Sequence, residues 1–392
     1  MKECKFLIVG AGIIGLTIAR ELLQRGHSDL LIIEKEDAPG RHASGRNSGV
    51  LHAGIYYSSD SLKARFCIEG NRLMKEYCRA KNLHLVESGK VIVAPLKEQQ
   101  EGLHELKNRA DRNGAIVHLI NRSELQKLEP YAFSYEDALH SPNTAVIDPL
   151  EILQSLQKEI EESGKAKLLF SASLNERAAD HTIESSQGSI RFEKLINAAG
   201  TYADEIAHKF DLARDYKIQP FKGTYRQLKR TNLVNGNIYS VPDLKNPFLG
   251  IHFCKNAHGQ VTLGPTAIPA LSRENYGAFE NLEQETLSIL FRDAVLLFQN
   301  PAFRNAASVQ LRKYSKKVVF REAKSMMPEL KLEDLQPSGK VGIRAQLVHW
   351  PSRQLYMDFL IEKGADSIHV LNAVSPAFTS SMAFAKHVVD ML

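Results

Sequence analysis

The order of apolar, small and polar residues at the start of the chain predicts a strand, a glycine turn, a helix and a second strand. The apolar run Phe6–Val9 leads into Gly10-Ala11-Gly12, and a second apolar run, Leu31–Ile33, ends at the acid Glu34. Between the two runs we expect a helix from Ile13 to about Gln24. Strand, turn, helix and strand in this order form the opening unit of a parallel sheet.

The glycines of this turn have the spacing of a dinucleotide-binding motif. Gly10 permits the tight turn, Gly12 lets the backbone approach a pyrophosphate, and Gly15 lets the helix pack closely on the sheet. The pyrophosphate then lies at the start of the helix, near Ile13 and Ile14, where free N–H groups and the helix dipole favour an anion. The alternative is that packing alone requires small residues here, but the strands, helix and final acid agree with a nucleotide site.

Glu34 is placed to accept hydrogen bonds from the ribose hydroxyls of the adenosine half, with Lys35 beside it. An acid at this position disfavours a 2′-phosphate, which argues against NADP. The motif does not separate FAD from NAD.

A second glycine-rich segment, residues 44–57, follows the second strand and favours a flavin. Its small residues allow close approach to a flat ligand, while Arg46 and Asn47 supply donors for phosphate or ring oxygens. A surface loop would be richer in Ser, Asp and Pro, whereas this segment carries apolar and aromatic residues. The expected cofactor contacts here are Ser44, Arg46, Asn47, Ser48, Gly49 and His52.

Two further segments also combine an apolar strand with small or polar residues that could contact a cofactor. Residues 194–200 form a short apolar strand that runs into Ala199 and Gly200, and residues 368–381 predict a strand, a polar turn and a helix start. Either Ser375 or Thr379 could cap that helix, and its N-terminal dipole would stabilise a reduced, anionic flavin. The expected cofactor contacts in this last segment are Ser375, Pro376, Ala377 and Thr379.

Taken in order, these segments resemble the FAD-dependent D-amino-acid-oxidase-like superfamily, and more narrowly the L-2-hydroxyglutarate oxidase/dehydrogenase family. The resemblance spans nearly the whole chain and is most specific at residues 44–57 and 247–253, with shorter matches at 220–223, 241–243, 263–265, 342–346 and 371–381. It implies an α/β fold with a discontinuous Rossmann-like FAD-binding domain of the glutathione-reductase type and a mixed α+β substrate domain whose antiparallel sheet roofs the flavin. We expect the FAD-binding domain at 1–85, 143–218 and 333–392, and the substrate domain at 86–142 and 219–332.

Within the substrate domain, alternating apolar residues at Phe248–Cys254 and Gln260–Gly264, around the turn 256–259, predict a hairpin with His252 in its first strand. Oxidation of a 2-hydroxy acid needs a base for the hydroxyl proton and a cation for the carboxylate. His252, a histidine in an apolar strand, is the expected base, and a satisfied core histidine is the alternative.

Three other residues have expected roles at the site. The resemblance implies that Arg344 grips the substrate carboxylate and contacts the cofactor site, unless it is a surface arginine. His52 is expected to contact the flavin ring, and in some relatives of the superfamily a histidine near this place carries the flavin covalently. Lys222 is a secondary candidate for a second carboxylate or for a water at the flavin N5, with a plain strand-end lysine as the alternative.

The family resemblance implies oxidation of an L-2-hydroxy dicarboxylate, most simply L-2-hydroxyglutarate to 2-oxoglutarate, with electrons passed to quinone and the respiratory chain or to oxygen. The chain departs from the family pattern at Thr224, where an acid is common, at Thr266, where Asn is usual, and across 348–357. These departures put the substrate in question. Glycerol 3-phosphate, an amino acid or an N-methylated amine are alternative substrates, and a flavin-binding protein without turnover is an alternative from another class.

Composition narrows the class further. The chain has 392 residues, 43% of them hydrophobic, and a formal charge of +5 with scattered basic residues, so a two-domain globular protein is expected and nucleic acid is not an expected partner. The four cysteines have no metal or redox spacing, so we expect reduced thiols, no metal and a cytoplasmic protein. The oligomeric state is left open.

The sequence also raises a membrane question. We expect no signal peptide, because residues 1–5 are too short to form one before the first strand. The apolar run Leu287–Phe298 is interrupted by Arg292 and Asp293, so no membrane span is expected. The basic cluster at 311–317 could touch anionic lipid on the cytoplasmic side of the inner membrane, as the resemblance favours, or it could be a solvated loop beside a core helix.

Overall fold

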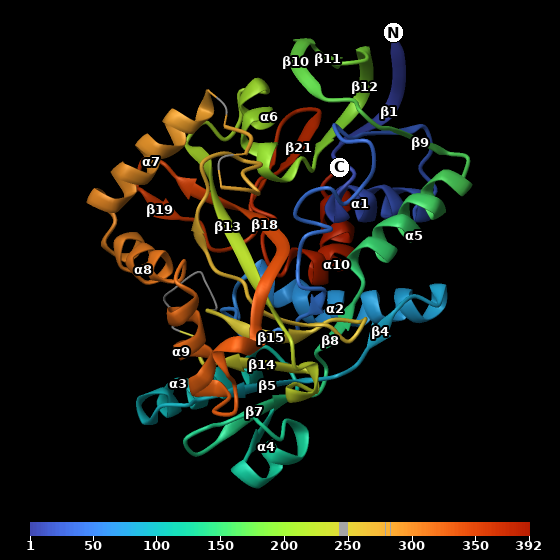
Figure 1. The fold of residues 1–392 in the computed structure, drawn as a ribbon. Helices are drawn as coiled ribbons and strands as arrows, with labels where there is room; N and C mark the ends of the chain where they lie inside the picture. The colour runs from blue at the N-terminus through green and yellow to red at the C-terminus, as the bar shows by residue number, and fades with distance from the viewer. Residues whose placement is uncertain (243–249, 279, 283) are drawn as a thin grey trace.

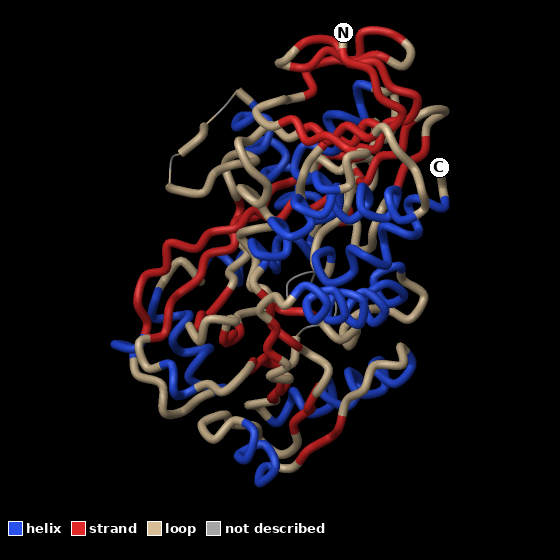
Figure 2. The backbone as a smooth tube through the Cα atoms, turned by 90° about the vertical axis from the view of Figure 1, so that its right-hand side faces the viewer, coloured by secondary structure: helices blue, strands red, loops and turns tan. Residues whose placement is uncertain are grey.

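The computed structural model describes residues 1–242, 250–278, 280–282 and 284–392. Over these ranges the strands form an 8-stranded sheet, a 10-stranded sheet and a small 3-stranded sheet (Figure 1). Seen from the side, one group of strands lies at the top of the molecule near the N-terminus and another lies below it (Figure 2). The expected α/β fold with two sheet-based parts is confirmed.

The 8-stranded sheet carries the predicted nucleotide elements. Its centre is parallel, because β1 pairs with both β2 and β12, β2 pairs with β9, and β12 pairs with β21 in the same direction. An antiparallel ribbon extends it at β10 and β11. The strands are β1 (Lys2–Val9), β2 (Leu30–Ile33), β9 (Ala166–Leu169), β10 (Leu174–Ala179), β11 (Thr182–Ser185), β12 (Gly188–Asn197), β20 (Ile361–Lys363) and β21 (Ser367–Val370).

Apolar residues on both faces bury the centre of this sheet. Along β1, Ile8 packs into a cluster with four helices, whereas Leu7 and Val9 point the other way into a second cluster with the β10–β11 ribbon. This alternation follows from the two-residue period of a strand, and the absence of a polar face fits a parallel sheet covered on both sides. The four helices are α1 (Ile13–Gln24), α2 (Leu62–Lys81), α5 (Pro149–Glu162) and α10 (Ala377–Asp390).

The 10-stranded sheet is built around the long antiparallel pair β13 and β18, which run side by side through the centre of the molecule (Figure 1). Its strand order is β19-β18-β13-β16-β15-β14-β5-β7-β6, with β17 on β13. The strands are β5 (Lys90–Val93), β6 (His118–Ile120), β7 (Ala138–Ser141), β13 (Tyr216–Leu228), β14 (Asn237–Ser240), β15 (His252–Lys255), β16 (Val261–Gly264), β17 (Ile268–Pro269), β18 (Leu335–His349) and β19 (Gln354–Leu355).

The remaining elements cover and connect the sheets. The small sheet consists of β3 (Val50–Leu51), β4 (Leu85–Val86) and β8 (Ala145–Ile147), and short 3-10 turns lie at Lys97–Gln99, Gly200–Tyr202, Thr231–Leu233 and Leu332–Asp334. Helices α7, α8 and α9 follow one another along one edge of the molecule (Figure 1). The other helices are α3 (Gln100–Arg112), α4 (Arg122–Leu128), α6 (Ala203–Lys209), α7 (Glu285–Gln299), α8 (Pro301–Arg312) and α9 (Lys316–Met326).

Most local predictions are confirmed. Helix α1 has the predicted bounds, and β12 and β21 end where the two downstream segments were expected to begin their turns. The predicted hairpin is β15 and β16, while its first residues, Phe248 and Leu249, lie outside the described residues. The domain boundaries stay a prediction, and the pairing of β18 with β13 joins residues 335–349 to the 10-stranded sheet.

The predicted cap of the last helix is wrong. The N-cap of α10 is Pro376, and no side chain caps it. Thr379 lies inside the first turn, where its hydroxyl accepts a hydrogen bond from the His52 N–H (3.1 Å) and donates to the Val50 carbonyl (3.4 Å). The hydroxyl is therefore used to attach α10 to the segment around β3 rather than to cap its own helix.

Candidate active site

A cavity of about 780 Å³ is lined by residues of both large sheets, a size typical of cofactor and substrate sites. The glycine turn, the loop at 40–52 and the segments 198–202 and 373–379 contribute one part of its wall. Strands β13, β15 and β18 contribute another. Among the expected cofactor contacts, those that line the cavity are Gly10, Gly12, Ile13, Ile14, Glu34, Lys35, Ser44, Arg46, Asn47, Ser48, His52, Ala199, Gly200, Arg344, Ser375, Pro376, Ala377 and Thr379.

The glycine turn has the geometry that a pyrophosphate requires. Gly10 has φ +105°, and a Cβ on Gly15 would lie 1.9 Å from the Gly10 carbonyl oxygen, so neither position accepts a side chain. A Cβ on Gly12 would meet only the Ser44 hydroxyl, at 3.0 Å, and Gly12 lines the cavity. The missing side chain at Gly12 leaves backbone exposed to a ligand at the start of α1, which fits the dinucleotide part of FAD.

Two polar side chains order the turn. The Ser44 hydroxyl accepts a hydrogen bond from the Ile13 N–H (3.0 Å), and Gly12 is the N-cap of the helix. Glu34 accepts from the backbone N–H of Ala11 (2.9 Å) and of Glu36 (3.0 Å), which holds its carboxylate at the cavity wall. Its contact with the ribose stays a prediction.

The loop at 44–49 is held by its own side chains. The Asn47 amide donates to the Ser44 carbonyl (2.7 Å) and accepts from the Gly49 N–H (2.9 Å). The Arg46 Nε donates to the Arg41 carbonyl (2.6 Å), and its guanidinium lies 4.0 Å from the centre of a tyrosine ring, that of Tyr276. These bonds give both residues a structural role, and their contacts with the cofactor stay predictions.

Two of the expected cofactor contacts, Gly15 and Gly49, do not line the cavity. Each packs against backbone atoms of a neighbouring segment. Gly15 packs against Gly10, and a Cβ on Gly49 (φ +75°) would lie 2.4 Å from the Ile147 carbonyl oxygen.

Arg344 brings a cation into the cavity from β18, opposite Phe221 of β13. Its Nε donates to the Gln346 side chain (3.3 Å). Burial lowers the pKa of the guanidinium to about 10, an effect opposed by Tyr57, so Arg344 remains charged at neutral pH. A charged, largely buried guanidinium is suited to a carboxylate.

His252 faces the same cavity from β15 and lies opposite Tyr239 of β14. The two rings are stacked, with centroids 3.8 Å apart. The Nδ1 atom lies 3.2 Å from the Gly250 carbonyl, which can only accept, so Nδ1 carries the proton and Nε2 is the basic nitrogen. Burial, with smaller contributions from Lys90 and Lys313, lowers the pKa of His252 to about 3, which keeps the ring neutral.

His52 also lines the cavity, as expected. Its Nδ1 has no hydrogen-bond partner within the described part of the chain, and burial lowers its pKa to about 3. Ring contact or covalent attachment of the flavin at His52 stays a prediction.

Lys222 is not brought to the cavity. Its neighbours Phe221 and Gly223 line the wall, so strand alternation turns the lysine to the other face of β13. There Nζ donates to the Asn275 side chain (2.7 Å) and to the Gly277 carbonyl (2.6 Å). These bonds support the alternative of a structural lysine and give no support to contact with the substrate.

The two single-residue departures from the family pattern are neighbours. The hydroxyls of Thr224 and Thr266 lie 2.9 Å apart, and Thr266 lines the cavity. Thr224 lies on β13 and Thr266 in the loop between β16 and β17, so nothing in the local sequence pattern indicates that they are neighbours.

The residues behind the two histidines were not among the expected site residues. Lys90, at the start of β5, is only 2% exposed, and it lies against the rings of Tyr56 and Tyr239. The apolar run that follows Lys90 predicts a strand but does not indicate which side chains from other strands surround it.

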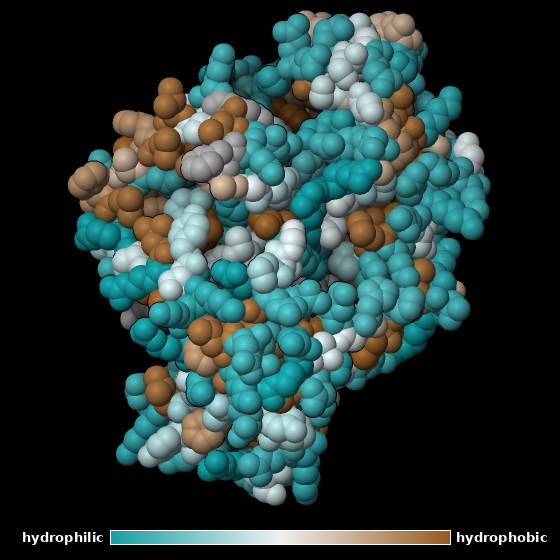
Figure 3. Space-filling view, viewed as in Figure 1, coloured by the Kyte–Doolittle hydropathy of each residue, from teal (hydrophilic) through white to brown (hydrophobic). Residues whose placement is uncertain are grey.

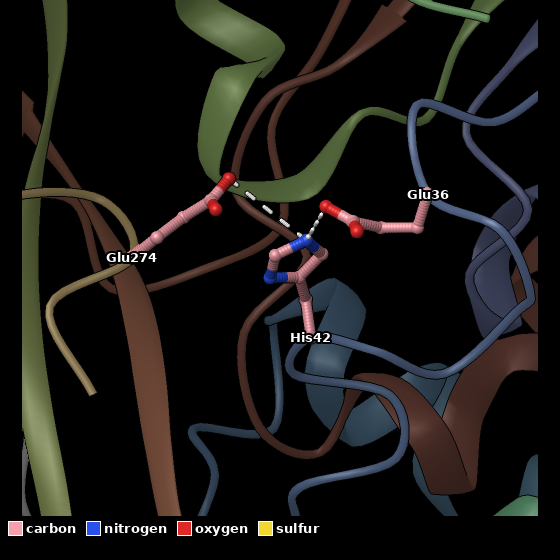
Figure 4. A group of neighbouring side chains, drawn as sticks. All are labelled: Glu36, His42 and Glu274. Atoms are coloured by element: carbon pink, nitrogen blue, oxygen red, sulfur yellow. Dashed lines mark hydrogen bonds and ion pairs between the residues drawn. The ribbon is translucent and has the colours of Figure 1, made fainter. Parts of the chain in front are cut away.

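A polar cluster lies at the edge of the cavity, where Glu36 and Glu274 flank His42 (Figure 4). The His42 Nε2 lies 2.9 Å from Glu36 and 3.8 Å from Glu274. These residue types can bind a metal, but the Lys35 ammonium is 2.5 Å from both carboxylates and already supplies the positive charge. The group joins the loop after β2 to the loop before α7.

The glycine turn, the two-sheet cavity and the cation–histidine pair define an FAD-dependent oxidoreductase. The model of the family described as "FAD dependent oxidoreductase" matches residues 5–391, and the chain belongs to this family. It is therefore an enzyme with FAD as its cofactor.

Its relatives place it more narrowly, with the L-2-hydroxyglutarate dehydrogenases. The mitochondrial L-2-hydroxyglutarate dehydrogenase of Homo sapiens is 33% identical over 98% of this chain and 87% of its own length. The L-2-hydroxyglutarate dehydrogenase of Escherichia coli K12 is also 33% identical, over 98% of this chain and 92% of its own.

Solved structures share the fold. An FAD-bound L-alpha-glycerophosphate oxidase from Mycoplasma pneumoniae has a TM-score of 0.79 at 22% identity, covering 100% of this chain and 95% of that one. Glycine oxidase from Geobacillus kaustophilus has a TM-score of 0.74 at 16% identity, covering 100% and 94%. In the described part of the structure, no helix is both long enough and apolar enough to cross a membrane.

Proposed function

We propose that this enzyme oxidises L-2-hydroxyglutarate to 2-oxoglutarate. The observation that carries the proposal is that Arg344 and the neutral His252 line the same cavity as the glycine turn. The names of the relatives supply the substrate. A hydroxy acid requires both a cation and a base, and these two side chains supply them.

The glycine turn and the segment 373–379 would hold FAD, which would supply an acceptor for the hydride of the carbon that bears the hydroxyl. Arg344 binds the adjacent carboxylate through charge-assisted hydrogen bonds and so orients that carbon. His252 takes the hydroxyl proton at Nε2, because Nδ1–H is held by the Gly250 carbonyl. Stacking on Tyr239 limits the rotation of the imidazole, which keeps Nε2 directed at one point.

The test is anaerobic bleaching of the yellow flavin. L-2-Hydroxyglutarate is added beside its D-enantiomer as matched control, and beside glycerol 3-phosphate, an amino acid and an N-methylated amine. We expect rapid bleaching with L-2-hydroxyglutarate alone. If another compound bleaches the flavin instead, that compound is the substrate and L-2-hydroxyglutarate is rejected. If no compound bleaches it, the result supports a flavin-binding protein without turnover.

An exposed apolar face on α7 supports membrane contact. Leu287, Phe291 and Phe298 lie on one side of the helix and are 75%, 65% and 83% exposed. Hydrophobic residues gather over α7 on the face shown in Figure 3. A surface of this kind on a helix is typical of an interaction site.

The basic cluster at 311–317, where α8 ends and α9 begins, is smaller than expected. Lys313 is buried and forms an ion pair with Glu322 (2.9 Å), so it does not belong to the surface. Lys313 is absent from the basic surface because its side chain is buried and its ammonium is paired with the Glu322 carboxylate. Arg312 and Lys317 are exposed and Lys316 is half-buried, so these three remain available to anionic lipid.

We propose that the α7 face contacts the membrane and that electrons pass to a quinone there. Replacing Leu287, Phe291 and Phe298 by serine should abolish co-sedimentation with anionic vesicles, whereas replacing Arg312, Lys316 and Lys317 by glutamine should weaken it only at low salt. Binding that survives the serine changes would reject the α7 face. Reoxidation of the reduced enzyme by oxygen but not by a soluble quinone would reject quinone as acceptor.

A further inference from the structure

Lys90 lies buried behind the wall of the active-site cavity, with 2% of its surface exposed. Its Nζ has no hydrogen-bond partner among the described residues. Burying an amine without a partner costs free energy, and an apolar side chain of the same length would avoid that cost. The position of Lys90 therefore calls for an explanation other than stability.

Aromatic rings connect Lys90 to the proposed base. Its Nζ lies 4.6 Å from the centre of the Tyr56 ring and 4.8 Å from that of Tyr239. Tyr239 in turn stacks on His252 with an interplanar angle of 13°. One tyrosine ring thus contacts both the amine and the imidazole.

Few other charges face this group. Cys67 of α2 and Cys254 of β15 lie near Lys90, and His52 lies near both Lys90 and His252. Lys313 approaches His252 from another side, but its ammonium is paired with Glu322. The tyrosines and cysteines are protonated at neutral pH, because burial raises their pKa values. Tyr225 of β13 and Lys340 of β18 face the same group from the other side of the sheet pairing, near Tyr239 and Cys254, and Arg344 lines the cavity with His252. Among these groups Lys90 is the buried ammonium that lies against the Tyr239 ring and has no hydrogen-bond partner within the described residues.

We propose that Lys90 is a positioning residue whose charge, acting across the Tyr239 ring, sets how readily His252 takes the hydroxyl proton of the substrate. This inference rests on the proposed function and goes beyond it. A protonated Lys90 opposes a second positive charge on His252, whereas a neutral Lys90 permits it. The Lys90 Nζ is 4.8 Å from the centre of the Tyr239 ring, and that centre is 3.8 Å from the centre of the His252 ring, so the two groups are at most about 9 Å apart. A unit charge at that distance and an effective dielectric constant of about 20 changes a pKa by roughly 1.4 units.

Burial lowers the pKa of Lys90 to about 7, so its charge changes in the neutral range. We expect the rate of flavin reduction at saturating substrate to rise roughly three- to tenfold through neutral pH as Lys90 loses its proton. Lys90→Met should hold the rate at the high-pH level at all pH values. Lys90→Arg, which keeps the charge, should hold it at the low-pH level.

The control is Lys75→Met. Lys75 is also buried, but it forms an ion pair with Glu87 and, within the described residues, has no hydrogen bond or ring contact with Tyr239 or His252, so this variant should keep the parental pH profile. A double-mutant cycle links the effect to the base: in a His252→Gln background, Lys90→Met should no longer change the profile. A pH profile that Lys90→Met leaves unchanged, or an effect that persists without His252, would overturn the inference.

A second readout does not depend on turnover. The pKa of Lys90 is lower in the folded than in the unfolded state, so the unfolded state binds more protons between pH 7 and 10, and the penalty of burying Lys90 shrinks as pH rises. Lys90→Met should therefore raise Tm most below pH 7 and progressively less toward pH 10. A Tm difference between the variant and the parental protein that does not change with pH would reject a titrating Lys90, whatever the substrate is. If no compound bleaches the parental enzyme, only the proposed function is rejected.

Discussion

Replacing Gly15 by alanine tests whether the contact between α1 and the glycine turn is required for cofactor binding. The new Cβ would lie 1.9 Å from the Gly10 carbonyl oxygen and 3.3 Å from the Ile8 side chain. Since a carbon–oxygen contact is normally about 3.2 Å or longer, the start of α1 must move away from the turn by roughly 1 Å. Overpacking of this kind costs about 1–3 kcal/mol.

This cost is divided between stability and binding, so the changes in Tm and in FAD affinity that correspond to the whole cost are each an upper limit. For a chain of this length, 1–3 kcal/mol lowers Tm by roughly 1–4 °C. The same free energy, expressed at the displaced pyrophosphate site, weakens FAD binding by roughly 5- to 150-fold. We expect Gly15→Ala to purify with substoichiometric FAD and to release the remainder on gel filtration.

The matched control is Gly339→Ala, because a Cβ at Gly339 meets nothing within 4 Å and its φ is not positive. That variant should keep full FAD occupancy and an unchanged Tm. Flavin content is measured from the visible absorbance per chain, and Tm from thermal unfolding. A Gly15→Ala protein with full occupancy and parental Tm would refute the close-packing argument.

Other predictions concern the remaining parts of the site and one buried acid. Glu34→Arg should lower FAD occupancy, because arginine cannot accept hydrogen bonds from a ribose, and unchanged occupancy would remove Glu34 from the site. Arg344→Lys should chiefly raise the substrate concentration at which flavin reduction is half-maximal, because a point charge replaces a planar guanidinium. His252→Ala should instead lower the limiting rate of flavin reduction by roughly 10²–10⁴-fold. Rapid-mixing kinetics at several substrate concentrations separates these two effects. Asp293 is buried, which raises its pKa to about 7 despite a hydrogen bond from Gln219 (2.8 Å). Between about pH 4 and 7, Asp293 keeps its proton in the folded state but loses it in the unfolded state, so the stability of the protein falls as pH rises through that window. The amount by which Asp293→Asn raises Tm should therefore grow from pH 4 to 7. A Tm increase that is independent of pH would contradict this.

The elements that depend on neighbouring residues could be predicted from the sequence. Helix α1 and the turn before it follow from a local order of glycines and apolar residues, and the β15–β16 hairpin follows from alternation around a polar turn. Strand alternation would also have excluded Lys222 from the cavity once Phe221 and Gly223 were assigned to its wall.

Interactions between distant segments could not be predicted in this way. Ser44 bonds the first N–H of α1 from 31 residues away, and Thr379 bonds the backbone of His52 across 327 residues. Lys90 and Tyr239 come from separate strands of the 10-stranded sheet, and only the assembled sheet brings them together behind His252. Local pattern carries no information on such pairings.

The discontinuous order of the 8-stranded sheet has a consequence for synthesis. Strand β1 and helix α1 leave the ribosome long before β21 and α10, yet all four elements contribute to one hydrophobic cluster. Since the cavity wall includes Ser375 and Ala377, a nascent chain cannot enclose the cofactor until α10 has left the exit tunnel. A nonsense mutation just before α10 should therefore yield a polypeptide that contains all the other elements of both large sheets but retains no flavin and becomes a substrate for proteolysis.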